Sequence, residues 1–527
     1  MLAPLDRADT QPGHTHRTDF DKFRLRSFVQ RLMALGEVEV HEEPVALADV
    51  SRIVEDSGKA VLFRQAGPER TEMIVAVSAS RSRVAAAFGL SDWKDVQQEY
   101  LKRLENPQKT LEVASADAPV HQVVIKGEAI DLASLPFHVQ HELDGGPYIS
   151  SAIDYCVDPE TGRTNVGCRR LMLRNRTTMR SNLTANSDLK KIYKRAVENK
   201  QKLPVTFVIG SHPLDFFAAT LRLPGDELGL VATLRGEPVP VVRGITNDIA
   251  VPADAEMTIE GYFDELGWRE MEGPYGEGFG YYGPMHIDPV FHVTAITKRR
   301  DSLFQSLVHS GRDSGQAESP NMGCLAAEAA AFKALRALGM EPAAVCAPTH
   351  SGRAQHIRVA LKNPGAGDAA KVVQALFKLP RFKHVFVMDA DIDPFNDRQV
   401  DWALSTRFRA DRDLTVETGF PPQHMDITMM EGGQDKMTKL GFDLTLPQGR
   451  GEKIDFKVPE APRFAATAAH RFASVRDALA AGPLYFAELM EAVGSRDGRE
   501  VALELDRLRE EGVLDRAEEG QWRLISK

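Results

Sequence analysis

Two glutamates that lie five positions apart, Glu272 and Glu277, stand on the segment Glu272–Gly280, which is punctuated by glycine and proline. Such a composition predicts a loop or a bent strand rather than a helix. Glycine also lets the backbone come close to a ligand. Two neighbouring carboxylates seldom ionise alike, because a like charge raises one pKa while a nearby cation lowers the other. The segment therefore either supplies an acid and a base to an active site or forms an exposed turn with two solvated glutamates.

A second segment, Asn165–Arg170, places an asparagine five positions before an arginine, directly after the turn Pro159–Gly162. This segment, followed later in the chain by the acidic one, resembles the UbiD-type decarboxylases, which use prenylated flavin mononucleotide (FMN). The resemblance runs from about Phe23 to about Pro459. Further matching segments follow in the same order: Gly36–Val40, Asp131–Leu132, Leu135–Pro136, Gly145–Tyr148, Pro224–Glu227 and Lys439–Asp443.

The resemblance implies a reversible, non-oxidative decarboxylase of an aromatic, heteroaromatic or α,β-unsaturated carboxylic acid, with an aryl-CoA thioester as a further option. Loss of carbon dioxide from an sp² carbon leaves electrons that no side chain accepts, so a cofactor must be the electron sink. By correspondence with the family, Arg170, Glu272 and Glu277 are the catalytic residues. Arg170 would orient the carboxylate, because a guanidinium pairs bidentately with it. Glu277 would return the proton, which requires a pKa raised by burial or by Glu272.

The resemblance also implies how the cofactor is held. Asn165 and Glu227 fall on metal-ligand positions of the family, and hard oxygen ligands suit Mn²⁺ or Mg²⁺. A potassium ion is expected nearby. Arg170 and Lys439 complete the expected cofactor-binding residues, with Lys439 on the phosphate. The family's third metal ligand is usually a histidine, but no histidine lies between Asn165 and Gly210. Two candidates replace it, depending on the alignment: Thr184 and Asp188.

Alternation of helical and strand patterns predicts a multidomain protein of mixed α/β and α+β class. We expect an N-terminal α/β domain, a central flavin-binding split β-barrel, a C-terminal α/β domain for oligomerisation and a winged-helix-like tail. The barrel and the oligomerisation role come from the resemblance, not from composition. The expected domains cover residues 23–116, 117–320, 321–459 and 467–527.

The tail lies beyond the resemblance and reads as three short helices and a hairpin, which suggests a winged-helix shape. Residues 467–527 contain nine Lys and Arg against twelve Asp and Glu, a net charge of −3. DNA binding needs a basic face, so this charge argues against it. A flavin-binding regulator nevertheless remains an alternative function, because of the tail's shape. A noncatalytic assembly subunit of a carboxylase or decarboxylase complex is another, because of the missing histidine.

Composition sets the remaining expectations. The net charge of −10 argues against a nucleic-acid partner, and no apolar run approaches the ~20 residues that span a bilayer. The four cysteines lack the C-x-x-C spacing of a zinc site and suit a cytoplasmic protein. We expect a homodimer or homohexamer that receives its cofactor from a flavin prenyltransferase and acts on a small carboxylic acid. The polar loop expected at Gly311–Asn321 would lie near the pocket, but it does not identify that acid.

Overall fold

The fold comes from a computed structural model, which describes residues 18–184, 186–221, 225–423, 426–430, 436–446, 459, 461–464, 471–517 and 519–525. The chain separates into two units. The larger contains residues 1–359, 372–386 and 415–441, and the smaller contains residues 360–371, 387–414 and 442–527. Pro224 of the motif Pro224–Glu227 lies outside the described residues.

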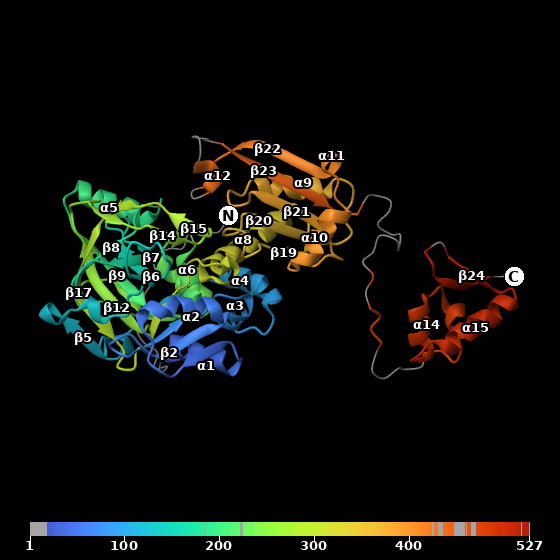
Figure 1. The fold of residues 1–527 in the computed structure, drawn as a ribbon, viewed down its shortest axis with the longest axis horizontal. Helices are drawn as coiled ribbons and strands as arrows, with labels where there is room; N and C mark the ends of the chain where they lie inside the picture. Colours follow the sequence, from blue (N-terminus) through green and yellow to red (C-terminus); the bar gives the residue numbers. More distant parts are fainter. Residues whose placement is uncertain are drawn as a thin grey trace. The chain divides into compact units, whose positions relative to one another are not determined.

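Six antiparallel strands of the larger unit form a closed barrel, drawn in teal to yellow-green in Figure 1. Their order is β12-β9-β6-β7-β8-β17, and pairing of β17 with β12 closes the ring. A further short strand, β5 (Val123–Lys126), pairs in antiparallel with β17. This barrel confirms the predicted barrel architecture. The six strands are β6 (Tyr148–Val157), β7 (Thr164–Leu173), β8 (Thr178–Ser181), β9 (Leu203–Ile209), β12 (Met257–Phe263) and β17 (Val290–Lys298).

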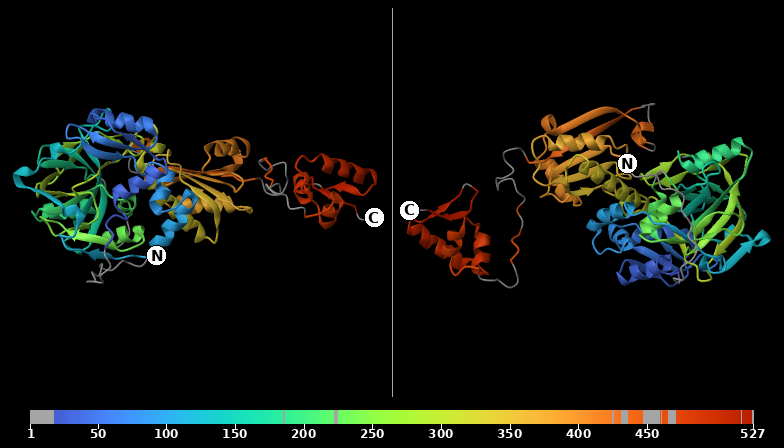
Figure 2. Two further views of the ribbon diagram at one scale, coloured as in Figure 1. Left: turned by 90° about the horizontal axis from the view of Figure 1, so that it is seen from below. Right: turned by 180° about the vertical axis from the view of Figure 1, so that it is seen from behind.

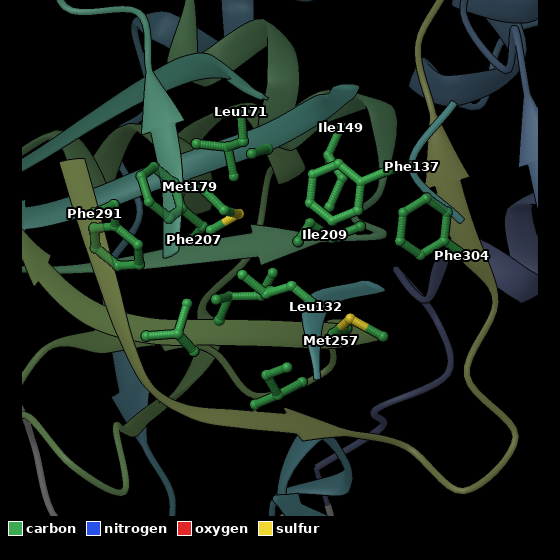
Figure 3. Close-up of a cluster of buried hydrophobic side chains, with 14 of the residues drawn as sticks. Leu132, Phe137, Ile149, Leu171, Met179, Phe207, Ile209, Met257, Phe291 and Phe304 are labelled. Atoms are coloured by element: carbon green, nitrogen blue, oxygen red, sulfur yellow. The ribbon is translucent and has the colours of Figure 1, made fainter. Parts of the chain in front are cut away.

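Strand β6 is buried on both faces, because alternate residues join two different cores. Ile149 and Ala152 belong to one apolar cluster, which also contains Leu171, Phe207 and other residues labelled in Figure 3. Ile153 and Tyr155 belong to a second cluster, to which helices α6 (Pro213–Ala219) and α7 (Glu227–Arg235) contribute. The alternation leaves little freedom in the register of β6 and its neighbour β7, because a one-residue slip would exchange the two faces.

The N-terminal part contains a four-stranded sheet of order β1-β2-β3-β18. Helices α1 and α2 lie against it (Figures 1 and 2). Strand β18 follows the last barrel strand, β17, in the sequence. It pairs in parallel with β3. These elements are α1 (Leu25–Ala34), β1 (Val38–His41), α2 (Val50–Ser57), β2 (Ala60–Ala66), β3 (Thr71–Val75), α3 (Arg81–Phe88), α4 (Val96–Leu104) and β18 (Phe304–Ser306).

Two small ribbons and one three-stranded sheet complete the larger unit up to residue 310. The ribbons pair β13 with β16 and β14 with β15, and the sheet has the order β11-β10-β4. Their elements and the nearby helices are β4 (Thr110–Glu112), α5 (Asp188–Glu198), α6 (Pro213–Ala219), α7 (Glu227–Arg235), β10 (Val239–Arg243), β11 (Ala250–Pro252), β13 (Glu270–Glu272), β14 (Tyr275–Glu277), β15 (Tyr281–Gly283) and β16 (His286–Asp288).

The next part of the chain forms a five-stranded sheet of order β19-β20-β21-β23-β22. This part of the chain begins with the 19-residue helix α8, which starts at Glu318. The segment expected to be a loop at 311–321 is therefore helical in its last four residues. The elements of this part are α8 (Glu318–Arg336), β19 (Pro342–Cys346), β20 (His356–Leu361), α9 (Asp368–Phe377), β21 (His384–Asp389), α10 (Asp397–Thr406), α11 (Ala410–Asp413), β22 (Leu414–Phe420), α12 (Ile427–Met430) and β23 (Met437–Leu444).

The tail forms three helices and a hairpin, as the sequence predicts, around a small apolar core of its own. Likeness to a winged helix stays a prediction. Across the described residues, no helix is both long and apolar enough to cross a membrane. The tail elements are α13 (Val475–Ala481), α14 (Phe486–Val493), α15 (Arg499–Glu510), β24 (Leu514–Arg516) and β25 (Trp522–Leu524).

Candidate active site

Arg170 on strand β7 and Glu272 at the end of β13 form a side-on ion pair. Arg170 Nε donates to Glu272 Oε1 and Arg170 Nη2 donates to Glu272 Oε2, each over 2.8 Å. Arg170 Nη1 donates to Oε1 of Glu277, at the end of β14. The structure therefore brings together the three residues that the sequence predicts as catalytic, and a single guanidinium serves two carboxylates.

A sharp turn between β13 and β14 brings the two glutamates to the same arginine. Gly273 has φ +87°, a left-handed conformation that favours glycine. Gly145 packs against this turn so closely that a Cβ there would lie 2.1 Å from the carbonyl oxygen of Gly273. Gly145 N donates to the carbonyl of Pro274 over 2.9 Å, and Gly273 N donates to Tyr148 Oη over 3.2 Å. The predicted motif Gly145–Tyr148 thus supports the acidic segment.

Glu277 also contacts a histidine that the sequence did not single out. His309 Nε2 lies 3.4 Å from Glu277 Oε2. Burial acts to raise the pKa of Glu277, but His309 and Arg170 outweigh it, and the pKa lies below its ordinary value. The expectation of a raised pKa for Glu277 is therefore wrong for this arrangement. The physical reason is that His309, and then Arg170, which binds Glu277 directly as well as Glu272, both favour the ionised carboxylate.

A further carboxyl group adjoins Glu272. Asp288 on β16 is fully buried; one of its oxygens accepts from Leu183 N over 2.7 Å, and the other, Oδ2, has no hydrogen-bond partner. Burial, with a contribution from the charge of Glu272, raises the pKa of Asp288 to about 7. Glu272 itself is fully buried and also receives a long hydrogen bond of 3.5 Å from Asn182 Nδ2. Protonation of Asp288 below about pH 7 would avoid a third negative charge beside Arg170.

The ring of Tyr275 lies beneath the ion cluster. The guanidinium carbon of Arg170 is 4.5 Å from its centroid, a cation–π arrangement. The ring of His309 packs on Tyr275 at 5.6 Å between centroids, and the ring of His141 at 5.3 Å. Tyr275 Oη donates to Gln140 Oε1. The aromatic ring therefore limits the positions open to both Arg170 and His309.

Asn165 and Glu227 form a second cluster at the start of β7. Glu227, the first residue of α7, accepts from Val166 N over 2.7 Å, which places its carboxylate beside Asn165. Asn165 Nδ2 donates to buried Asp154 over 3.3 Å, so the amide nitrogen is engaged and the amide oxygen remains for another ligand. Asn165 and Arg170, five residues apart, lie on opposite faces of β7 and roughly 16 Å apart along the strand.

The second cluster carries an excess of negative charge. The pKa of Glu227 is raised to about 7 by burial and by the charges of Asp188, Asp154 and Asp226. Oxygen donors with surplus negative charge suit a hard divalent cation. Of the two candidates for a third ligand, Asp188 acts on Glu227 electrostatically, whereas the Thr184 hydroxyl accepts from Asn182 over 3.3 Å. Within the described residues, no set of three His, Cys, Asp or Glu side chains could hold a metal on its own.

The contacts given for Lys439 on β23 are with residues outside both clusters. Its buried ammonium donates to the carbonyls of Phe377 over 2.8 Å and Leu379 over 2.7 Å, and it lies 4.8 Å from the ring centroid of Phe420. Burial lowers the pKa of Lys439 to about 8. In this arrangement the side chain joins α9 to the sheet, and a phosphate contact stays a prediction.

A cavity of about 1110 Å³ lies beside the first cluster. It is lined by Gly276 and by Val308 and Ser310, the two neighbours of His309. Arg170, Glu272 and Glu277 are not among its lining residues. The cavity thus reaches the segments that carry the cluster without reaching the ion pairs themselves.

Sequence reasoning missed His309 and Asp288, which stand outside the matched motifs. Asp288 pairs across the β13–β16 ribbon with Glu270, which lies two residues before Glu272. The hairpin that pairs β13 with β16 could have been predicted from the Gly and Pro residues between the two strands. No sequence signal pointed to His309, because its contact with Glu277 depends on tertiary packing alone.

Models of two UbiD-family domains match this sequence. The 3-octaprenyl-4-hydroxybenzoate carboxy-lyase Rift-related domain matches residues 111–312, and the C-terminal domain of the same enzyme family matches residues 320–444. Together the two matches span more than half of the chain. The chain therefore belongs to the UbiD family of carboxy-lyases.

Individual relatives agree with this assignment. The chain is 29% identical over 424 residues to the anhydromevalonate phosphate decarboxylase of Methanosarcina mazei, with 80% of this chain and 95% of that protein covered. It resembles the structure of the UbiD-class enzyme HmfF from Pelotomaculum thermopropionicum in complex with FMN, at 28% identity and a TM-score of 0.77, covering 83% of this chain and 97% of that one. An evolved dimeric form of HmfF in complex with prFMN matches at 27% identity and a TM-score of 0.74, covering 84% and 97%.

Proposed function

We propose that the protein removes carbon dioxide reversibly and without oxidation from an aromatic, heteroaromatic or α,β-unsaturated carboxylic acid, including an aryl-CoA thioester. The observation that carries this proposal is the Arg170 guanidinium held between Glu272 and Glu277 in a family of carboxy-lyases. A scaffold or a regulator has no need for one buried cation with two carboxylates. The arrangement supplies a binding group for a substrate carboxylate and a nearby group for the returning proton.

In this proposal the cofactor is prenylated FMN, which when bound supplies the electron sink for decarboxylation. The support from relatives is that HmfF structures contain FMN or prFMN. Asn165 and Glu227 would hold a divalent ion, Mn²⁺ or Mg²⁺, that carries the flavin phosphate, and Asp188 is our choice for the third ligand. The surplus negative charge around Glu227 supports a cation at this position. Lys439 and a potassium ion remain proposed parts of the phosphate site.

The roles of the catalytic residues follow from their contacts. Arg170 would bind the substrate carboxylate, because guanidinium and carboxylate pair through parallel hydrogen bonds. Glu272 keeps Arg170 in place through its two 2.8 Å hydrogen bonds. Glu277 would return the proton to the carbon that loses carbon dioxide. Because Glu277 is ionised in the present arrangement, it must gain a proton before this step.

The remaining proposals concern surroundings. We infer a cytoplasmic homodimer or homohexamer that takes its cofactor from a flavin prenyltransferase and has no nucleic-acid or membrane partner. The described dimeric form of HmfF supports self-assembly. We retain the domain division at residues 23–116, 117–320, 321–459 and 467–527. Helix α8 starts at Glu318, three residues before the proposed start of the third domain at residue 321.

The function is tested by co-expressing the protein with a flavin prenyltransferase. Its visible spectrum would show whether flavin is bound, and a panel of unsaturated and aromatic acids would be assayed for released carbon dioxide. Bound flavin with turnover of at least one acid is the expected result. Flavin binding with DNA affinity and no turnover would favour a regulator, and neither flavin nor turnover would favour an assembly subunit.

A further inference from the structure

Glu277 has a different partner on each of its two oxygens. Oε1 accepts from Arg170 Nη1, and Oε2 lies 3.4 Å from His309 Nε2. Arg170 and His309 both pack on the ring of Tyr275, with the guanidinium carbon at 4.5 Å and the imidazole centroid at 5.6 Å. The carboxylate is therefore held between a permanent cation and a group that can gain or lose a proton near neutral pH.

A substrate carboxylate that binds Arg170 must compete with the carboxylates already there. Glu272 holds Arg170 through two hydrogen bonds and is fully buried, whereas Glu277 holds it through one. The single contact is the easier one to exchange. Once displaced, Glu277 would face a negative charge where it now faces a cation, and its tendency to take up a proton would rise.

The surroundings of His309 allow it to supply that proton. His309 is half-buried, and desolvation favours its neutral imidazole and lowers its pKa, while Glu277 acts in the opposite direction. The charged groups that act on it are Glu277, Arg353 and Arg170. Its two neighbours in sequence, Val308 and Ser310, line the cavity of about 1110 Å³, so His309 lies next to space that water can enter.

We propose that His309 is a positioning residue for the reaction, which holds Oε2 of Glu277 and passes it the proton that decarboxylation consumes. This inference rests on the proposed function. The imidazolium Nε2–H bond of His309 breaks as the O–H bond of Glu277 forms. That O–H bond then breaks as the new C–H bond forms at the carbon that lost carbon dioxide. His309 regains its proton from water, so one proton is consumed for each carbon dioxide released.

The first test needs no turnover. Histidine side chains are labelled with ¹⁵N in the full chain, and the His309 signal is assigned by its absence from His309→Gln. Removing the negative charge in Glu277→Gln should lower the His309 pKa by about one unit, because a nearby carboxylate favours the imidazolium. The control is His141→Gln, since His141 also packs on Tyr275 but bonds Asp144 at 3.1 Å instead of Glu277. An unchanged His309 pKa in Glu277→Gln would overturn the inference.

The second test uses the cofactor-loaded enzyme and an acid that the wild-type protein converts. His309→Gln keeps a hydrogen-bond donor for Glu277 but cannot carry a proton. We expect kcat to fall about tenfold to a hundredfold with KM within about threefold, and the decline of wild-type kcat with rising pH to disappear. His141→Gln should keep the wild-type pH profile. Retention of both kcat and pH profile in His309→Gln would refute the proton-transfer role.

The two tests separate the inference from the function on which it rests. If the wild-type protein converts no acid, the proposed function fails. The nuclear magnetic resonance titration still decides whether the charge of Glu277 raises the pKa of His309. If acids are converted but His309→Gln behaves as wild type, the function stands and the inference fails. A slow His309→Gln enzyme with an unchanged pH profile would reduce His309 to packing and likewise refute proton transfer.

Discussion

Arg170 holds Glu272 through two parallel hydrogen bonds of 2.8 Å, although the two residues are 102 positions apart in the chain. Side-on pairing of this kind uses Nε and Nη2 and leaves Nη1 for another anion. In the present structure that anion is Glu277. The pair therefore defines where a substrate carboxylate could bind, and the first two predictions test it.

Glu277→Gln should keep the fold and the bound flavin but reduce turnover about a hundredfold or more, the usual contribution of a positioned general acid. Steady-state release of carbon dioxide measures this, and flavin absorbance confirms that the site is loaded. The control is Glu270→Gln on the neighbouring β13–β16 ribbon, whose carboxylate pairs with Arg174 at 3.0 Å instead of Arg170. Undiminished turnover in Glu277→Gln would remove Glu277 from the mechanism.

Arg170→Met should destabilise the protein by about 3 kcal/mol near pH 8, because it leaves buried carboxylates without their cation. The loss should be smaller near pH 5. Without the cation, burial should raise the folded-state pKa of Glu277 above its unfolded value, so acid favours the folded variant. Denaturant unfolding at both pH values measures the difference. An equal loss at pH 5 and pH 8 would contradict the described charge arrangement.

Asn165→Ala and Glu227→Ala should each lose bound flavin, because each removes a ligand of the ion that would join protein and phosphate. Flavin absorbance and metal content of the purified variants are the measurements. Glu160→Ala, in the exposed turn before β7, serves as the control. Full flavin and metal occupancy in both variants would show that the phosphate site lies elsewhere.

Asp288 should make the protein less stable as pH rises. Its pKa is raised from 3.8 to about 7 in the folded state, so its stabilising contribution is present below about pH 4 and is lost as pH approaches 7. A shift of this size corresponds to at most about 4 kcal/mol. Asp288→Asn cannot titrate, so the midpoint of thermal unfolding of the variant should rise relative to wild type between pH 5 and pH 8. A constant difference across that range would refute the raised pKa.

Deleting the chain after Ala461 should leave flavin binding intact, because every residue assigned to the site lies earlier and the tail has its own apolar core. Oligomer size or solubility should change before chemistry does. Neither the full chain nor the truncated one should bind duplex DNA, since the tail is acidic and phosphate attraction supplies most nonspecific affinity. Fluorescence anisotropy at several salt concentrations tests this. Salt-sensitive binding that disappears on truncation would revive the regulator.

Elements with a clear local pattern could be predicted from the sequence. Apolar residues recur at helical spacing over Leu189–Asn199 and predict a helix, which is α5. The turn-bounded segment Ser150–Val157 predicts a strand, which is β6. Helix α3 was missed, because six of its eight residues are buried and it shows little amphipathic pattern. The run Val120–Ile125 also predicts a strand, but β5 starts only at Val123, because Pro119–His121 form a 3-10 turn. Domain boundaries stay predictions.

The sequence by itself determined the class of the fold, the family and the identity of the Arg170, Glu272 and Glu277 set, because these depend on residue types in a fixed order. Only the tertiary structure decided that His309 joins Glu277, that Asp288 adjoins Glu272 and that Lys439 bonds backbone carbonyls. It also decided the direction of the pKa of Glu277, which opposed the expectation. Charge interactions and desolvation depend on distances between residues remote in sequence, and only the folded chain sets those distances.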